Sequence, residues 1–357
     1  MGYKKDIELL FEYASRYRFE EFDTLFSALE TKLTPDAMWE AYSMRAQIKL
    51  FASDPSMIDD LEIAGQASTQ PEYACLNTIW ESDSSNRLVV YGNTMDSLTL
   101  FMSSLPRARE IMLGLYGEPG DVMVRQILCN IHYFVGNMAE ALLLAEEPFS
   151  PEYDNHTDEL LMLSMKYRCY LAFGEIQKAE QCMMEIIRLS KRYPECVAPY
   201  QAFRGWANIT TSWNGDSPRF YRDKKGALQP VLDDRLELIR DGASRTTQLE
   251  APFVEYATRH YADAYSLRQY YMDIFHAIYW LSIGDRQQIE ISCGMLCDMA
   301  DATGFITPVV ECGEHAIALL RYLSQSAPPC SKSWLEKVLP MAQQYEQTLE
   351  AYRSIHA

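Results

Sequence analysis

The sequence has few glycines and prolines, lacks long apolar runs and is short of positive charge. Gly and Pro number only 16 each in 357 residues and gather at segment ends, as is typical of helices joined by short connectors. No apolar run approaches the roughly 20 residues of a membrane-spanning helix, so we expect no contact with a membrane. The first residues, MGYKKDIELLFEYA, lack a signal peptide's apolar core, and the nine cysteines show no disulfide-framework spacing. We therefore expect a cytoplasmic protein.

The shortage of positive charge bears on possible partners. The chain carries 50 Asp and Glu against 32 Lys and Arg, for a net charge of −18. A surface that binds nucleic acid needs a basic face to neutralise phosphates, so we expect no direct nucleic-acid contact. The excess lies in residues 1–160, with 27 acidic and 11 basic side chains, whereas residues 161–357 carry 23 and 21. A solvated acidic surface and an attraction for a basic partner both account for this asymmetry.

Motifs of catalysis and cofactor binding are also missing. The sequence has no glycine-rich phosphate loop, which argues against a kinase, an NTPase or a dehydrogenase. None of the six histidines lies in a local signature with a nucleophilic Ser or Cys. Adjacent carboxylates such as Asp59 and Asp60 point about 100° apart on a helix, which is unsuitable for shared proton transfer. We therefore expect a protein that is not an enzyme and has no catalytic residues, metal or cofactor.

Three turns share a glycine followed by a polar residue, with an apolar residue five positions after the glycine. The turns are Gly136-Asn137, Gly174-Glu175 and Gly284-Asp285, and the apolar residues are Ala141, Ala179 and Ile289. Glycine lets the chain leave one helix at positive φ, and the polar residue is suited to capping the next helix. The apolar residue packs where the two helices cross. Each turn therefore predicts a hairpin of two helices.

Weaker copies of this turn extend the series along the chain. They are Tyr17-Arg18-Phe19, Ser53-Asp54, Gly92-Asn93 and Gly215-Asp216, with a degenerate turn near Leu249 and a break at Pro328-Pro329. Markers at positions 17, 53, 92, 136, 174 and 215 lie 36 to 44 residues apart, and the 69 residues from 215 to 284 fit two repeats. Such periods are typical of helical-repeat arrays. We expect an all-α, right-handed superhelix (α-solenoid) of about eight or nine hairpins.

This array is expected to occupy residues 1–357 as a single domain. It can be subdivided into repeats at 1–212, a loop at 213–230 and C-terminal repeats at 231–357, because the loop is the longest segment without periodicity. Apolar residues recur at helical spacing between the turns, and we expect these stripes to form core. Two such stripes are Phe19, Phe22, Phe26, Leu29 and Leu33, and Trp334, Val338, Met341, Tyr345, Leu349 and Tyr352.

The segments GNMAEA, residues 136–141, and GEIQKA, residues 174–179, are similar to the turn and second-helix start of tetratricopeptide repeats. The irregular spacing resembles more closely the sensor superhelix of large ATP-dependent LuxR-type bacterial regulators, the MalT-like kind. In that family a helical-repeat array receives an inducer or a partner protein, while ATPase and DNA-binding modules lie elsewhere. Neither module has a motif here, so the resemblance implies the sensor part alone, as a stand-alone protein or as a fragment.

A local reversal of charge marks a candidate site in residues 188–225. This segment carries eight basic side chains against three acidic ones, with aromatic residues between them. Aromatic faces beside guanidinium groups suit a sugar, a nucleotide or an anionic peptide. The candidate ligand-binding residues are Tyr200, Arg204, Trp213, Arg219 and Tyr221. The alternative is that Phe203 and Trp206 are core residues and the basic loop is simply solvated.

One constellation resembles a metal site. Cys293 and Cys297 lie one turn apart on one expected helix, and Cys312 and His315 lie on the next. An antiparallel pair would bring these thiolates and the imidazole together in a way that suits zinc. The alternative is that the cysteines are small buried apolar residues at helix crossings, and their spacing matches no compact zinc motif. We therefore predict no metal.

The expected function is binding, with two forms left open. One is a tetratricopeptide-like scaffold that captures a peptide or partner protein on its concave face, and the other is a sensor for a small inducer, as in a transcriptional regulator. The alternative from another class is an all-α metal-dependent enzyme. That enzyme would need inward-facing carboxylates one turn apart, for which the sequence offers Asp298 with Asp301 and Glu311 with Glu314. Both pairs also fit a solvated face.

Overall fold

The computed structural model describes residues 2–16, 18–51, 56–67, 89–91, 95–211, 220–222, 228–230, 264–325 and 330–356. Most of these residues are helical, and the predicted all-α fold is confirmed for this part of the chain. The first helices are α1 (Gly2–Ser15), α2 (Phe19–Leu29), α3 (Pro35–Phe51), α4 (Met57–Ala67), α6 (Met95–Tyr116), α7 (Glu118–Phe134), α8 (Met138–Glu146) and α9 (His156–Ala172). They are followed by α10 (Ile176–Arg192), α11 (Val197–Thr211), α13 (Leu267–Ile283), α14 (Arg286–Thr303), α15 (Thr307–Val310), α16 (Gly313–Gln325) and α17 (Lys332–His356).

Two pairs of short antiparallel strands accompany the helices. β1 (Val89–Tyr91) pairs with β4 (Ala264–Ser266), and β2 (Phe220–Arg222) pairs with β3 (Leu228–Pro230). The second pair falls within the segment 213–230 that was expected to be a loop. The sequence showed no periodicity there because three-residue strands are too short to produce an alternating pattern.

The three glycine turns join helices as predicted. Gly136 lies between α7 and α8, Gly174 between α9 and α10, and Gly284 between α13 and α14, with φ values of 83°, 76° and 81°. The apolar residues five positions later, Ala141, Ala179 and Ile289, are buried. The hairpin predicted at each of these turns is therefore confirmed.

The predicted capping is correct for only one of the three turns. The side chain of Asp285 accepts a hydrogen bond from the backbone N–H of Gln288 at 3.1 Å. Neither Asn137 nor Glu175 caps its helix through the side chain in the part of the chain that the structure describes. Instead, their backbone N–H groups donate to the carbonyls of His132 at 2.7 Å and Tyr170 at 2.8 Å, which is the Schellman closure of the preceding helix. The polar residue therefore completes the end of one helix instead of starting the next.

The weaker turn markers have mixed outcomes. The segment at Tyr17 connects α1 to α2, as predicted, although Tyr17 itself lies outside the described residues. Gly92-Asn93 also lies outside them. Ser53-Asp54, Gly215-Asp216, Leu249 and Pro328-Pro329 lie outside the described residues.

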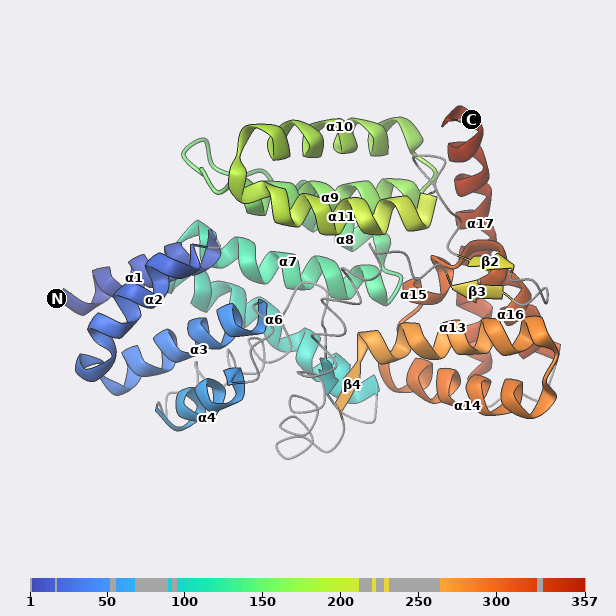
Figure 1. Ribbon diagram of the computed structural model, residues 1–357, viewed down its shortest axis with the longest axis horizontal. Coiled ribbons are helices and arrows are strands. Elements are labelled where there is room, and N and C mark those ends of the chain that lie inside the picture. The colour runs from blue at the N-terminus through green and yellow to red at the C-terminus, as the bar shows by residue number, and fades with distance from the viewer. Residues whose placement is uncertain are drawn as a thin grey trace.

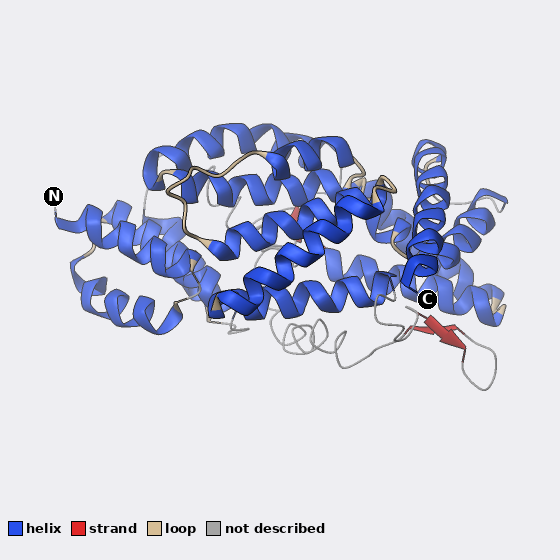
Figure 2. Ribbon diagram, turned by 90° about the horizontal axis from the view of Figure 1, so that it is seen from above, coloured by secondary structure: helices blue, strands red, loops and turns tan. Residues whose placement is uncertain are grey.

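The helices pack mainly against their neighbours in the chain. The pairs α3–α4, α6–α7, α7–α8, α8–α9, α9–α10, α13–α14 and α16–α17 are in contact. They form an elongated body with α1 at one end and α16 and α17 toward the other (Figures 1 and 2). The predicted stripes belong to the core: Phe22, Phe26 and Leu29 are buried on α2, and Trp334, Val338, Tyr345, Leu349 and Tyr352 are buried on α17.

Contacts between distant segments join the C-terminal helices to the middle of the chain. α17 runs across the ends of α9 and α11 and contacts both (Figure 1). The segment before α15 binds the end of α7, because the Ile306 N–H donates to the Phe134 carbonyl at 2.7 Å and the Thr307 hydroxyl donates to the Tyr133 carbonyl. These bonds occupy carbonyls that a helix C-terminus leaves without an intrahelical partner. Helices α15 and α17 therefore dock onto the α7–α11 region.

A disulfide joins Cys297 on α14 to Cys330, with Cα atoms 4.5 Å apart. It connects α14 to the residues that lead into α17, and the cysteine spacing in the sequence did not indicate it. Cys293 and Cys312 are buried thiols that are not part of a disulfide. The zinc arrangement considered above is not formed, because within the described residues no group of three or more His, Cys, Asp or Glu side chains is placed to hold a metal ion.

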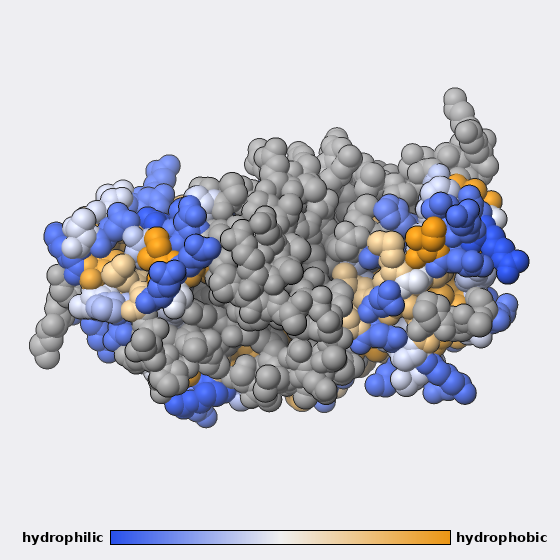
Figure 3. Space-filling model, turned by 90° about the horizontal axis from the view of Figure 1, so that it is seen from below, coloured by the Kyte–Doolittle hydropathy of each residue, from blue (hydrophilic) through white to orange (hydrophobic). Residues whose placement is uncertain are grey.

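The described surface mixes hydrophilic and apolar side chains. Figure 3 shows apolar residues between hydrophilic ones at both ends of one face. On α14, for example, Ile291 and Met295 are about half exposed. Scattered exposed apolar side chains are normal on a folded domain. Among the described helices, none has the length and apolar content needed to cross a bilayer.

Candidate functional site

The structure brings together only part of the predicted ligand site. Tyr200 and Arg204 lie one turn apart on α11, where Tyr200 is half-buried and Arg204 is exposed. Trp213 and Arg219 lie outside the described residues, and for Tyr221 only the backbone in β2 is described. The five residues therefore cannot be assembled into one site from the described part of the chain.

The alternative interpretation of Phe203 and Trp206 is confirmed. Both are buried, and both pack edge-on against the ring of Tyr167 on α9, with centroid distances of 5.2 and 6.2 Å. The guanidinium of Arg168 stacks on Trp206, 4.4 Å from its centroid. These aromatic residues fix α11 onto α9, so they belong to the core that supports the neighbouring surface.

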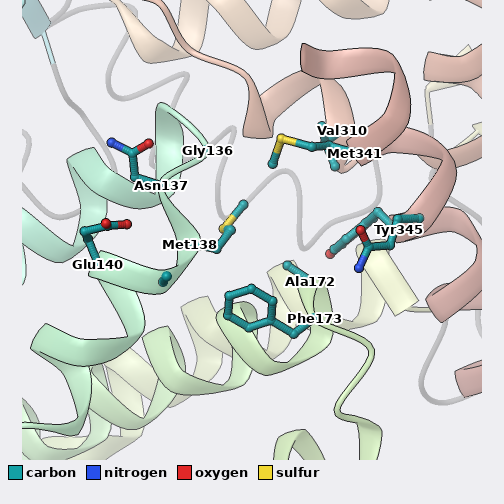
Figure 4. Close-up of a pocket in the computed structure, with 11 residues that line it drawn as sticks. Gly136, Asn137, Met138, Glu140, Ala172, Phe173, Val310, Met341 and Tyr345 are labelled. Atoms are coloured by element: carbon teal, nitrogen blue, oxygen red, sulfur yellow. The ribbon is translucent and has the colours of Figure 1, made fainter. Parts of the chain in front are cut away.

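A pocket of about 300 Å³ lies where two glycine turns meet α17. Its walls come from the α7–α8 turn and the start of α8, the end of α9, α15 and the middle of α17 (Figure 4). The lining residues are Gly136, Asn137, Met138, Ala139, Glu140, Ala172, Phe173, Val310, Met341, Gln344 and Tyr345. Most of them are apolar, and the polar ones are few, as is usual for a small-ligand pocket.

The glycine turns are what allow the walls to approach each other. A Cβ atom at Gly136 would lie 3.3 Å from both Ile306 Cδ1 and Met341 Cε, which is tighter than ordinary van der Waals contact. A Cβ atom at Gly174 would lie 3.3 Å from the hydroxyl oxygen of Thr348 on α17. Glycine therefore serves two purposes at these turns, since it permits positive φ and leaves room for the helices that pack against the turn.

The floor of the pocket is buried, and the aromatic ring at its mouth is exposed. Val310 and Tyr345 are each only 1% exposed, and Met138 is buried beside them. Phe173 has 41% of its surface exposed, although it is a large apolar residue. In the view of Figure 4, Met138 lies between Glu140 at one end and Tyr345 at the other, with the Phe173 ring below. A partly exposed ring over an apolar floor can stack against an incoming apolar group.

Hydrogen bonds from two tyrosines to a buried carboxylate hold α15 and its neighbours together. The Tyr133 hydroxyl donates to Glu311 Oε1 at 2.7 Å, and the Tyr271 hydroxyl donates to Glu311 Oε2 at 2.8 Å. Burial raises the pKa of Tyr133 well above its usual value, so this hydroxyl stays protonated and keeps donating. The network joins α7 and α13 to the segment that supplies Val310.

The carboxylate pairs proposed for an alternative metal enzyme do not form such a centre. Glu311 is buried and accepts two tyrosine hydroxyls, whereas Glu314 is exposed. Asp298 and Asp301 are both exposed, and Asp301 accepts a hydrogen bond from the Ser331 N–H at 3.3 Å. Among the described residues these four carboxylates therefore meet across no metal-sized gap.

Glu140 carries the single formal charge among the lining residues that the structure describes. Glu140 is exposed and lies in the first turn of α8. His132, one turn before Gly136, is close enough to interact with it, but burial lowers the pKa of His132. The imidazole is therefore neutral at pH 7 and leaves the charge of Glu140 uncompensated.

Sequence reasoning found two of the segments that form this pocket and missed the rest. The glycine turns marked the start of α8 and the end of α9, but only as connections between helices. Nothing in the sequence indicated that Met341 and Tyr345 would face these turns, because their stripe predicts only burial. Phe173 directly before Gly174 gave no signal either, because Val135 and Ile283 stand at the same place in the other two turns.

Comparison with known proteins adds no assignment to this geometry. No protein-family model matches the chain, and no curated protein sequence matches it either.

Proposed function

We propose that this protein is a non-enzymatic binding module of the helical-repeat kind, which holds a peptide, a partner protein or a small inducer. The observation that carries the proposal is the pocket of about 300 Å³ between the Gly136 turn, the end of α9 and α17. Its floor is apolar and buried, its polar groups are few, and its mouth is open to solvent through Phe173. These are the properties of a site that recognises one small group by shape.

We further propose that the hairpins form a right-handed, tetratricopeptide-like superhelix. In support, α7–α8 and α9–α10 are adjacent hairpins, their glycines lie 38 residues apart in the sequence, and both turns close with the same backbone hydrogen bonds. Such an array presents side chains from successive helices along one surface. A partner protein would then occupy the pocket with one side chain and contact the neighbouring helices with others.

A sensor role, as in the signal-sensing part of a transcriptional regulator, is the form of this proposal that we develop further. A ligand in the pocket would contact α8, α9 and α17 at the same time, because all three supply lining residues. It would therefore favour the conformation in which α17 is docked over the one in which it is not. That shift would be the signal to the rest of the regulator.

The proposal is tested by selecting peptides and then removing the pocket's exposed ring. Peptides are selected from a random displayed library against the full chain, and their affinity is measured by fluorescence anisotropy. The substitution Phe173→Asp places a charge at the mouth and is expected to weaken binding about tenfold or more, since ring-to-pocket contacts dominate such interfaces. A panel of metabolites, screened by the rise in Tm, tests the small-inducer form in the same way.

The matched control is Met184→Asp. Met184 is 67% exposed on α10 and is not one of the lining residues, so its replacement adds the same charge away from the pocket. Circular dichroism of both variants checks that they fold. Equal affinity of the wild-type chain and the Phe173→Asp variant for every selected peptide and metabolite would remove the pocket as the binding site.

A further inference from the structure

The charge of the pocket narrows the class of ligand that it can hold. Ten of the eleven lining residues that the structure describes are uncharged, and the eleventh is Glu140. Its carboxylate makes no ion pair with another described residue. An anionic ligand would therefore meet repulsion at the mouth, whereas a cationic group would find an unpaired carboxylate.

Groups near the mouth do not offset this charge. The backbone N–H groups at the start of α8 carry the positive end of the helix dipole, equivalent to about half an elementary charge, against the full charge of Glu140. Lys178, the closest cationic residue after Phe173 in the sequence, is bound to Glu175 at 2.9 Å. His132 is half-buried, and its Nδ1 has no hydrogen-bond partner among the described residues. Arg168 packs against Tyr133 and Trp206 and is not a lining residue. The balance of charge among the described lining residues therefore stays negative.

The uncharged side chains that line the pocket favour a ligand with a flat apolar ring system. The Phe173 ring is partly exposed, and the thioethers of Met138 and Met341 are adaptable surfaces that pack well against aromatic rings. The amide oxygens of Asn137 and Gln344 can accept hydrogen bonds from an ammonium group. A volume of about 300 Å³ is at the lower end for a ligand pocket, so the body is one small ring system.

We propose that the pocket binds a small aromatic primary amine, with its ring over Met138 and Phe173 and its ammonium group on Glu140. This inference rests on the proposed binding function and specifies its ligand. The carboxylate supplies the charge that distinguishes an amine from its neutral and acidic analogues. The ring stacks on Phe173, while the thioethers fill the space beneath it.

Three probes with one ring system test the inference on the full-length chain. Tryptamine is cationic at pH 7, N-acetyltryptamine is neutral and indole-3-acetate is anionic. Binding is followed by NMR of ¹³C-labelled methionine methyl groups, because Met138 and Met341 report on the pocket directly. We expect tryptamine to bind about tenfold more tightly than N-acetyltryptamine, and indole-3-acetate to bind most weakly, as one screened charge pair requires.

The variant Glu140→Gln tests whether the charge of Glu140, and not the shape of the pocket, gives the preference for tryptamine. It is expected to weaken tryptamine binding about tenfold and to leave N-acetyltryptamine within about twofold of the wild-type affinity. The control is Glu20→Gln, which also neutralises an exposed glutamate in the first turn of a helix, α2, and is expected to leave all three affinities unchanged. Both positions are exposed, and the Tm of each variant checks that folding is preserved.

The possible results distinguish the proposed binding function of the pocket from its proposed preference for an aromatic amine. If none of the probes shifts the methyl signals of Met138 or Met341, the pocket does not bind ring systems of this class and the inference is overturned. The binding function itself then fails only if the selected peptides and the metabolite panel also bind the wild-type chain and the Phe173→Asp variant equally. If all three bind equally, the pocket remains a binding site but the preference for an amine is overturned. If the Glu140→Gln variant still prefers tryptamine over N-acetyltryptamine, Glu140 does not cause the preference, and the proposed contact between the ammonium group and Glu140 is wrong.

Discussion

The turns at Gly136 and Gly284 have the same sequence signature but different surroundings. Both glycines have φ near 80° and join two antiparallel helices. At Gly136, a Cβ atom would lie 3.3 Å from side-chain atoms of Ile306 and Met341, whereas at Gly284 it would meet no described atom within 4 Å. One turn is covered by the C-terminal helices and forms a wall of the pocket, whereas the other has no close neighbour among the described residues.

This difference shows that the turn signature determines a helical hairpin but does not determine whether the hairpin forms part of a pocket. In both turns, glycine is required because the backbone adopts a left-handed conformation that other residues tolerate poorly. Only the packing of α15 and α17 makes the Gly136 turn part of a candidate site. Removing or loosening α17 should therefore affect the central hairpins and leave the α13–α14 turn largely unchanged.

The largest expected effect comes from reducing the disulfide between Cys297 and Cys330, which fixes the start of α17 to α14. It closes a loop with a sequence separation of 33 residues, and a loop of that length contributes about 3 to 4 kcal/mol by restricting the unfolded chain. We expect the free energy of unfolding, measured in urea with and without reductant, to fall by about that amount.

The Cys330→Ser variant is the control for this experiment. It should match the reduced wild-type protein and show no further response to reductant. If reductant leaves the stability of the wild-type protein unchanged, the disulfide contributes nothing to holding α17.

The second effect is a dependence of the unfolding free energy on pH, which we expect in the central hairpins and not in the α13–α14 hairpin. Asp158, in the first turn of α9, is buried, and burial raises its pKa to about 6 despite hydrogen bonds from Tyr153, Gln126 and Asn155. The folded state therefore holds this proton to a higher pH than the unfolded chain, whose carboxyl has an ordinary pKa of about 3.9. Stability falls as pH rises from about 4 to about 6, by about 3 kcal/mol from this group.

The substitution Asp158→Asn removes the titrating group. It should flatten the dependence of unfolding free energy on pH across that window, as measured by urea denaturation at several pH values. Hydrogen exchange of α9 and α14 amides over the same window localises the effect, which we expect to be larger in α9. A variant with the same slope as the wild-type protein would show that other groups cause it.

The third test compares the two turns directly. Gly136→Ala should cost about 2 to 3 kcal/mol, because it adds a contact with Ile306 and Met341 to the strain of positive φ. Gly284→Ala should cost only the strain, about 1 to 2 kcal/mol. Both are measured by chemical denaturation, and equal losses at the two positions would mean that α15 and α17 do not press on the Gly136 turn.

The smallest effect concerns the residue after each glycine. Asp285 caps α14 through its side chain, so Asp285→Ala should cost about 1 kcal/mol. At Asn137 the backbone N–H makes the bond and the side chain does not cap, so Asn137→Ala should change stability by less than about 0.5 kcal/mol. A loss at Asn137 as large as that at Asp285 would show a capping role in solution.

The sequence predicted the elements better than their arrangement. Helical periodicity identified the stripe from Trp334 to Tyr352, and the structure buries most of it. The same pattern could not reveal that Met341 and Gln344 of this helix face Gly136, because periodicity reports that a side chain is covered but not by which segment. The candidate residues on α11 were chosen for local charge and aromatic content, but Phe203 and Trp206 beside them are core.

The sequence by itself determined the helical class and the hairpins at Gly136, Gly174 and Gly284, because helix termination by a left-handed residue is a local property of a few adjacent positions. The tertiary structure alone decided the pocket, the disulfide and the docking of the C-terminal helices. These depend on residues far apart in the chain, such as Tyr133 and Glu311, which are 178 positions apart and bound through one hydrogen bond. Contacts of that range leave no periodic or local trace, since each partner's neighbours in sequence are compatible with many other packings.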